Sequence, residues 1–159
     1  GTDNSSNMNE IVRYDLSTQN SGEWTTIAKV NEANQRGGVA FVVEDKVYAG
    51  LGEKSNGIRN GFYVSSDSLT KWELIPSIPA QLGVISSGVY DEQKKSFFMI
   101  DNDGKIWEYN LTTEQWTSRS LWIRMKNYHM FMLDGSIYIL GQDIYQKNKF
   151  TVYNPIWDN

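Results

Sequence analysis

The residues that could do chemistry in this chain are few. Its 159 residues include no Cys and a single His, His129, while Asp and Glu together number 19. Without Cys the chain has no disulfide, no thiolate metal ligand and no cysteine nucleophile. A lone His is more often a hydrogen-bonded structural residue than a ligand or a base. We therefore expect no transition metal and no cofactor.

Asp101-Asn102-Asp103-Gly104 is the one acidic motif with the look of a metal loop. It resembles the start of a calcium loop, in which carboxylate and carbonyl oxygens bind the ion. The later Gly and the distal Glu of such loops are missing at the proper spacing. We expect a tight turn between two strands, and calcium binding is the second reading.

Hydrolytic chemistry has weak support in the residue pattern. A glycosidase needs two carboxylates about 5 to 9.5 Å apart across a cleft, and most acidic residues here fall in expected turns. The chain also lacks Gly-x-x-x-x-Gly-Lys-Ser/Thr and Gly-x-Ser-x-Gly, the signatures of phosphate loops and nucleophile elbows. We expect no catalytic residue and a chain that is not an enzyme.

The elements that must position any site form a repeat. Trp24, Trp72, Trp116 and Trp157 recur at intervals of 48, 44 and 41 residues, which is the period of a propeller blade. Each follows an extended segment with an aromatic residue, as Tyr109-Asn110 precedes Trp116. We expect these four Trp side chains to fill the same slot between blades and to be buried in the core.

Hairpins precede three of these segments. The arms 39–43 and 46–50 are apolar and flank a short acidic turn, and two later hairpins turn at 91–95 and at Asp134-Gly135. Asp-Gly suits a two-residue turn because both central residues need positive φ. Strands that are apolar almost throughout are covered on both faces.

These patterns predict an all-β chain, a β-propeller or partial propeller of four-stranded antiparallel blades with essentially no helix. Residues 11–159 hold the repeats, in units of about 11–30, 38–76, 84–120 and 129–157, or about three and a half blades. Because closed propellers usually carry about four to eight blades, we rank a fragment of a larger ring first. A ring completed by assembly of copies comes second, and a very small closed ring third.

The repeats resemble the kelch repeat, which has an apolar strand ending in a Gly pair, a Tyr-Asp-like step and then a Trp. Tyr109-Asn110 and Trp116 match, whereas Gly50-Leu51-Gly52 and Gly141-Gln142 depart from the Gly pair. A second segment, Val64 to Trp72, is similar to the Asp-box of sialidase-type propellers, with Leu69 in place of its Gly. In that family the Asp-box stabilises a turn and is not catalytic. Such domains are common in exported proteins of gut-type bacteria.

A propeller brings its d-to-a and b-to-c loops to one rim, where a to d are the strands of a blade in chain order. Aromatic and Arg side chains, which are frequent at binding hot spots and sugar platforms, occur in or beside these loops. The candidate ligand-binding residues are Arg36, Arg59, Trp122, Arg124, Tyr128 and Tyr145. For Trp122 and Tyr128, packing between blades is the competing interpretation, and for Arg59 it is plain solvation.

The composition of the chain limits the classes of partner that it is expected to bind. The net charge of −4 and the scattered Lys and Arg give no basic patch for nucleic acid. No apolar run reaches the roughly 20 residues of a membrane helix. Residues 1–10 are polar and rich in Asn and Ser, so we expect a disordered leader or chain end there. The resemblance to exported bacterial proteins implies that this protein is exported too, to the periplasm, the cell surface or the extracellular space.

The sequence thus favours a non-enzymatic module that binds protein or glycan through its loop rim, with a homo-oligomer that completes a ring as one form it could take. The alternative is part of a glycan-acting enzyme, a glycosidase or a sialidase-like one, whose site other blades complete. A purely structural spacer is the third reading.

Overall fold

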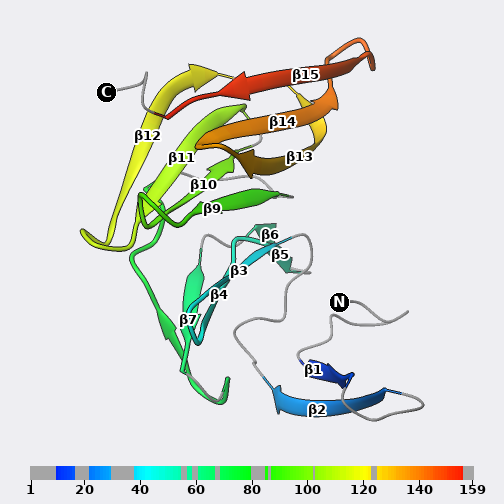
Figure 1. The fold of residues 1–159 in the computed structure, drawn as a ribbon, viewed down its shortest axis with the longest axis vertical. Coiled ribbons are helices and arrows are strands. Elements are labelled where there is room, and N and C mark those ends of the chain that lie inside the picture. The colour runs from blue at the N-terminus through cyan, green and yellow to red at the C-terminus, as the bar shows by residue number, and fades with distance from the viewer. Residues whose placement is uncertain are drawn as a thin grey trace.

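The computed structural model describes residues 10–16, 22–29, 38–54, 57–58, 61–66, 69–79, 85, 87–101, 103–122 and 125–155. Every regular element in these residues is a β-strand, and all strand pairs are antiparallel. Figure 1 shows the sheets following one another along an arc. The predicted fold class is confirmed: the chain is an all-β partial propeller.

Five sheets make up the described structure. An N-terminal hairpin pairs β1 (Glu10–Asp15) with β2 (Glu23–Lys29). The first blade is a sheet of β3 (Val39–Val43), β4 (Lys46–Gly50), β7 (Phe62–Ser65) and β8 (Trp72–Leu74). A small hairpin of β5 (Glu53–Lys54) and β6 (Gly57–Ile58) lies in its b-to-c loop.

The second blade is a sheet of β9 (Gly88–Asp91), β10 (Ser96–Ile100), β11 (Lys105–Asn110) and β12 (Gln115–Trp122). The third blade has three described strands, β13 (Lys126–Leu133), β14 (Ser136–Gln142) and β15 (Asn148–Tyr153). Each blade thus follows chain order from strand to adjacent strand, as predicted. Glu10, which we placed in the leader, opens β1, and residues 1–9 lie outside the described part.

The turn chemistry follows the sequence. Asp134 and Gly135 have φ of 50° and 70°, as a two-residue hairpin turn with both residues in the left-handed region requires. The longer turn at residues 92–95 is held by Asp91, whose Oδ1 accepts hydrogen bonds from the backbone N–H groups of Gln93 and Lys94 at 3.0 and 3.1 Å. These hairpins set the register of strands a and b in each blade.

The first and second blades pack face to face around Phe97, which is fully buried. Its ring stacks on Phe41 at 4.4 Å and meets Phe62 edge-on at 5.8 Å, both from the first blade. Gly88 lies beneath the Phe41 ring, and a Cβ there would come within 2.6 Å of Phe41 Cζ. The close approach of the two sheets therefore depends on Gly at this position.

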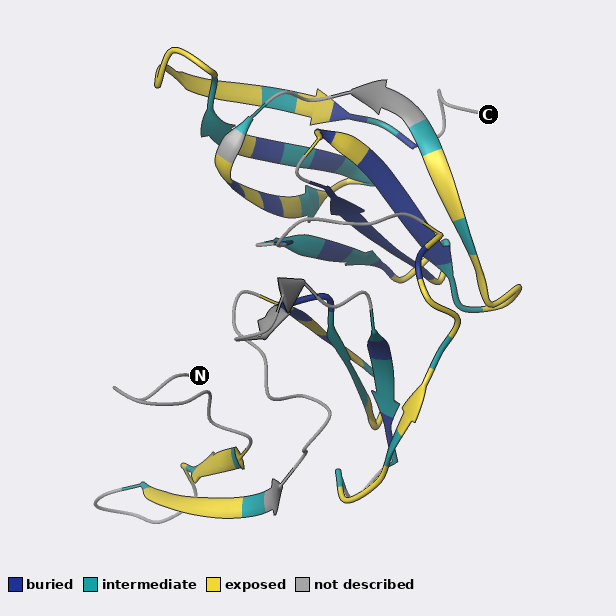
Figure 2. Ribbon diagram, turned by 180° about the vertical axis from the view of Figure 1, so that it is seen from behind, coloured by how far each residue is buried: buried dark blue, intermediate teal, exposed yellow. Residues whose placement is uncertain are grey.

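The second and third blades pack around a separate cluster. Phe98 and Ile106 of the second blade meet Ile137, Ile139 and Tyr153 of the third, and all are buried. Successive residues of β10, such as Phe97 and Phe98, therefore face opposite neighbours. This explains why the strand is apolar at almost every position, and Figure 2 shows it dark from end to end.

The repeat tryptophans do not share one environment. Trp116 packs on the first cluster, and its Nε1 donates to the Pro76 carbonyl at 2.6 Å. Trp72 is half-buried and donates to the Leu69 carbonyl at 3.2 Å. The prediction that Trp24 is buried is wrong: it is 67% exposed, because no other described sheet covers the face of the β1–β2 hairpin that carries it. Trp157 lies outside the described residues.

Among the described residues there is no helix that is long and apolar enough to cross a bilayer.

Replacing Phe97 by Ala should lower the free energy of unfolding by about 3–5 kcal/mol, because it empties the centre of the first interblade cluster. Val42→Ala is the control, since Val42 lies exposed on the opposite face of the first blade, and it should change stability by about 0.5 kcal/mol or less. Urea unfolding followed by Trp fluorescence measures both. Equal losses for the two variants would contradict this core assignment.

Candidate functional site

The rim of the arc holds the b-to-c turns, and two of them are built in the same way. Asp101 follows β10 and Asp143 follows β14, one in each of the last two blades. In each turn the Asp backbone N–H donates to the carbonyl of the residue four positions on, at 3.0 Å for Lys105 and 2.9 Å for Lys147. A repeated local fold therefore positions this edge of the molecule.

The Asp101 side chain organises the first of these turns. Its Oδ1 accepts hydrogen bonds from the Asp103 and Lys105 N–H groups, each at 2.9 Å, and its Oδ2 accepts one from Trp107 Nε1 at 2.8 Å. Asp101 is buried. The predicted tight turn is present, and both carboxylate oxygens are engaged by N–H donors rather than turned toward a shared ion site. Within the described residues no group of three or more acidic or His side chains could hold a metal.

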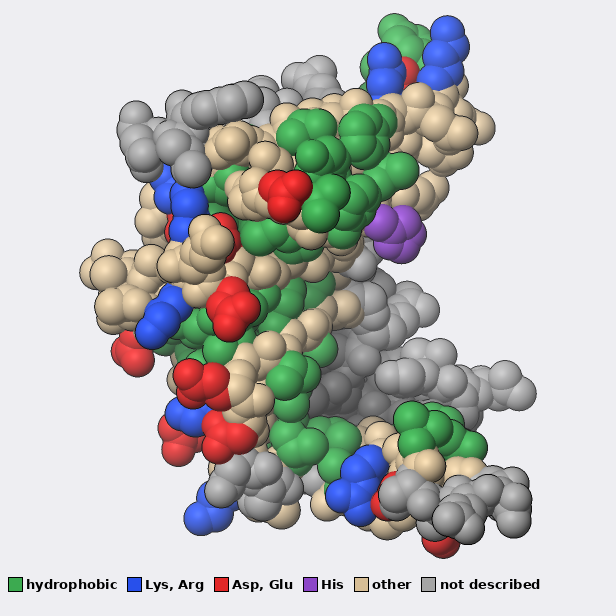
Figure 3. Space-filling model, in the orientation of Figure 1, with side chains coloured by type: hydrophobic (Ala, Val, Ile, Leu, Met, Phe, Trp, Pro, Cys, Tyr) green, Lys and Arg blue, Asp and Glu red, His purple; other side chains and the backbone are tan. Residues whose placement is uncertain are grey.

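The Asp143 turn repeats this bonding but carries different side chains. Asp143 Oδ1 accepts from the Tyr145 and Lys147 N–H groups, each at 2.9 Å. The turn presents Ile144 and Tyr145, which are 63% and 76% exposed. Figure 3 shows hydrophobic and basic side chains together at this projecting turn, at the upper right. Apolar side chains held in water on an ordered turn are typical of a contact surface.

The six predicted site residues have different positions. Arg36, Arg59 and Arg124 lie outside the described residues. Trp122 ends β12 opposite Lys105, so its backbone lies beside the Asp101 turn, but its side chain lies outside the described part. Tyr145 is exposed in the Asp143 turn on the rim, and its role in ligand binding stays a prediction.

Tyr128 lies in the core rather than on the rim. It is 5% exposed within the second interblade cluster, and its hydroxyl donates to the Ile100 carbonyl across the blade boundary. On β13 its side chain faces the second blade, since alternate residues of a strand point to opposite faces. Tyr128 is therefore removed from the candidate site, and the competing interpretation of packing between blades holds for it.

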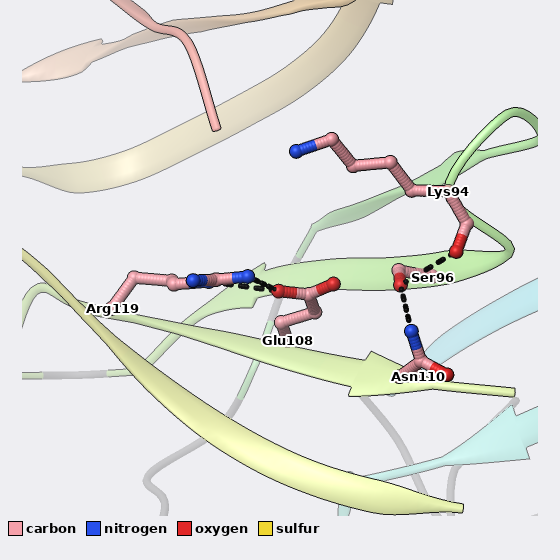
Figure 4. Close-up of polar contacts among 5 residues, drawn as sticks. All are labelled: Lys94, Ser96, Glu108, Asn110 and Arg119. Carbon is pink, nitrogen blue, oxygen red and sulfur yellow. Dashed lines mark hydrogen bonds and ion pairs between the residues drawn. The ribbon is translucent and has the colours of Figure 1, made fainter. Parts of the chain in front are cut away.

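The sequence reasoning missed one buried ion pair, shown in Figure 4. Glu108 is buried on β11, and its Oε2 accepts hydrogen bonds from Arg119 on β12, at 2.8 Å from Nε and again from a terminal nitrogen of the guanidinium. The signal was present in the sequence as a Glu between Trp107 and Tyr109 in an otherwise apolar stretch. Arg119 occupies this carboxylate, so we assign the pair to the cohesion of the blade.

The pKa values of Tyr48, Tyr90 and Tyr109 are raised above the ordinary value of Tyr. Burial, followed by the charge of Glu114, raises the pKa of Tyr109 to about 12. Burial is also the main cause that raises the pKa of Tyr48 and of Tyr90. These three hydroxyls therefore stay protonated at neutral pH.

Comparisons with known proteins show the fold alone. No family model matches the chain, and no curated protein matches its sequence. A solved structure of YjhT is 18% identical with a TM-score of 0.50, over 70% of this chain and 36% of that one. A protein of unknown function from Bacteroides thetaiotaomicron is 15% identical with a TM-score of 0.54, over 89% of this chain and 40% of that one. The chain thus matches well under half the length of either structure.

Asp143→Ala should release the turn that presents Tyr145, because it removes the acceptor of two backbone N–H groups. Amide hydrogen exchange at Tyr145 and Lys147 should accelerate by about tenfold, a factor equivalent to one hydrogen bond of about 1.4 kcal/mol. The amides of Asp103 and Lys105, in the equivalent turn, serve as the internal control. Unchanged exchange at Tyr145 would show that the turn does not depend on this carboxylate.

Alkaline pH should destabilise the fold through Tyr109. Its pKa is raised above the ordinary 10.0 to about 12 in the folded state, so its contribution to stability is complete below pH 10 and is lost as the pH rises toward 12. Tyr109→Phe cannot ionise and should flatten the fall in unfolding free energy across this window. Urea unfolding at a series of pH values measures the slope, and identical slopes for the variant and the wild type would refute the assignment.

Proposed function

We propose that this chain is a non-enzymatic binding module of a kelch-like propeller, which takes a protein or glycan ligand at its loop rim. The Asp143 turn is the contact point, with Tyr145 as the central side chain. We also propose that it is exported to the periplasm, the cell surface or the extracellular space, in keeping with the exported bacterial proteins that its repeats resemble. Trp122, Arg36, Arg59 and Arg124 remain candidate neighbours on the same rim.

The comparison of two turns with the same hydrogen bonding carries the proposal. The Asp101 turn continues with Asn102, Asp103 and Gly104, which are ordinary turn residues. In the Asp143 turn Ile144 and Tyr145 take the place of the first two, and both are exposed. The turn itself does not require large apolar side chains, since the same bonds form without them. Their presence is therefore better explained by contact with a ligand.

The surroundings of Tyr145 suit a sugar or a polar peptide. Lys147 is exposed in the same turn, and Lys149 lies 3.9 Å from Asp143, Nζ to Oδ2. An aromatic face stacks on the apolar face of a sugar ring, and nearby ammonium and carboxylate groups bind its hydroxyls. The same set fits a protein surface, where Tyr is a frequent hot-spot residue.

The propeller type rests on local geometry as well as on the repeat. Leu69 stands where the Asp-box has Gly, and its φ is 57°, in the left-handed region that favours Gly. Around it the Ser66 N–H donates to the Lys71 carbonyl and the Leu69 N–H to the Ser66 carbonyl, each at 2.9 Å. These bonds close a turn between β7 and β8, which supports the likeness to the Asp-box.

One observation favours a second candidate, a glycan-acting enzyme. The chain matches 36% and 40% of the lengths of the two similar structures. Blades beyond those described could supply catalytic carboxylates and Arg residues to a shared rim. Turnover of chromogenic glycosides by a longer chain that includes these blades would favour this candidate.

Tyr145→Ala should weaken ligand binding at least tenfold, or about 1.4 kcal/mol, while Tyr145→Phe should retain most of it because the ring remains. Leu74→Ala, an exposed change on β8, is the surface control. Soluble oligosaccharides and cell-surface proteins should be screened on arrays, and hits titrated while the amide shifts of residues 143–147 are followed by NMR. Hits that bind Tyr145→Ala as tightly as the wild type would refute the site.

A further inference from the structure

The outer face of the third blade is apolar, and no described residue of another sheet covers it. Rings from its three strands form a row across it: Phe131 and Tyr138 stack at 5.2 Å, and Tyr138 and Phe150 lie 5.7 Å apart. Phe131 and Phe150 are 43% and 58% exposed, and Leu133, Leu140 and Val152 beside them are exposed too. We call this surface the third-blade face. Figure 3 shows hydrophobic side chains gathered there, next to the single His.

The register identifies this face as a surface for packing against another blade. The first and third blades have equivalent cross-strand pairs. In the first blade Phe41 lies opposite Tyr48, and Phe62 lies opposite Gly50. In the third blade the corresponding pairs are Phe131 opposite Tyr138 and Phe150 opposite Leu140. In each blade the second pair lies two residues further along strand b. The first-blade set, Phe41, Tyr48 and Phe62, packs against the second blade. The third-blade face therefore repeats, ring for ring, a surface that is covered elsewhere in the same chain.

The interface between the first and second blades, which we call the intact interface, also shows which side chains cover such a surface. The ring centroid of Phe62 lies 6.4 Å from that of Tyr109 and 6.0 Å from that of Trp116. Tyr109 on β11 and Trp116 on β12 are paired across the two strands, and their own ring centroids are 4.8 Å apart with a 43° tilt. The interface between the second and third blades has the same arrangement. There Ile106 takes the position of Phe62 and Tyr153 takes the position of Tyr109, and both are buried in one cluster. A Tyr on strand c of one blade thus meets the strand-c apolar residue of the blade before it.

The other end of the chain carries a copy of this covering pair. Tyr14 and Trp24 face each other across β1 and β2, with ring centroids 4.9 Å apart and a 45° tilt. This arrangement matches that of Tyr109 and Trp116. Tyr14 is 41% exposed and Trp24 is the most exposed repeat Trp that the structure describes. The chain therefore displays both halves of its own interblade contact at its two ends.

We propose that the β1–β2 hairpin of one copy of this chain packs on the third-blade face of a second copy, with Tyr14 and Trp24 against Phe150. The contact joins two different surfaces, so two copies form it twice if the arc closes, and the closed ring has no bare end. In Figure 1 the hairpin and the third-blade face lie at opposite ends of the arc, which suits contact between copies rather than within one.

The lengths of the two similar structures agree with a ring made of two copies of this chain. Since 70% of this chain corresponds to 36% of one of them and 89% to 40% of the other, the whole chain corresponds to roughly half the length of each. Two copies would thus supply about as many residues as one of those propeller-like chains. In the closed assembly the loop rims of the two copies would be continuous.

The test is the mass of the chain in solution, measured by light scattering behind size exclusion across a range of concentrations. Wild type should be a dimer. Trp24→Ser and Phe150→Ser should each raise the dissociation constant of this dimer at least about 30-fold, the size of a hot-spot effect. Leu74→Ser is the matched control, because Leu74 is exposed on β8 of the first blade and belongs neither to the hairpin nor to the third-blade face, and this variant should stay dimeric.

Mixing the two variants distinguishes the proposed contact, which joins two different surfaces, from a contact between two identical surfaces. The Trp24→Ser copy keeps an intact third-blade face and the Phe150→Ser copy keeps an intact hairpin, so a mixture should recover a heterodimer through one contact. Circular dichroism and melting temperature confirm that each variant folds. A monomeric wild type at the highest concentration, a dimer that survives either change, or a mixture that stays monomeric would each overturn the proposal.

Discussion

The contact of the Phe97 ring with Phe41 and Phe62 is the interaction on which the described structure depends most. Stacked and edge-on rings at 4.4 and 5.8 Å hold two sheets face to face, and aromatic pairs in these geometries add to the free energy of area burial. The contact also needs a bare backbone at Gly88, where a Cβ would strike the Phe41 ring. Because both neighbouring blades contribute to this cluster, neither sheet can bury its apolar face alone.

A repeat architecture of this kind is stabilised by contacts between neighbours, so its weak points are its ends. The middle blade is buried on both faces, whereas the hairpin and the third blade each leave one apolar face exposed. Large exposed apolar surfaces mark places of interaction or a risk of aggregation. The matching geometry of Tyr14–Trp24 and Tyr109–Trp116 gives these exposed faces a specific complement.

The turns of the rim are stabilised in a different way from the sheets. In each turn a buried or half-buried Asp fixes the backbone, and the side chains of the residues within the turn are free to vary. Asp101 and Asp143 close the same turn, but only the second displays an aliphatic and an aromatic side chain. Function in propellers can therefore diverge at the turns without disturbing the sheets, since loops carry variation that strands do not tolerate.

The sequence by itself determined the strands, their order within blades and the hairpin turns, because apolar runs, Asp-Gly chemistry and the Trp period are local signals. It also placed Tyr145 in an exposed turn. The tertiary structure decided which of the recurring aromatics are covered: Tyr128 entered the core and Trp24 stayed exposed. Pairing within a blade is set by neighbours in sequence, but burial depends on whether another blade packs against that face. No residue pattern within one repeat contains that information.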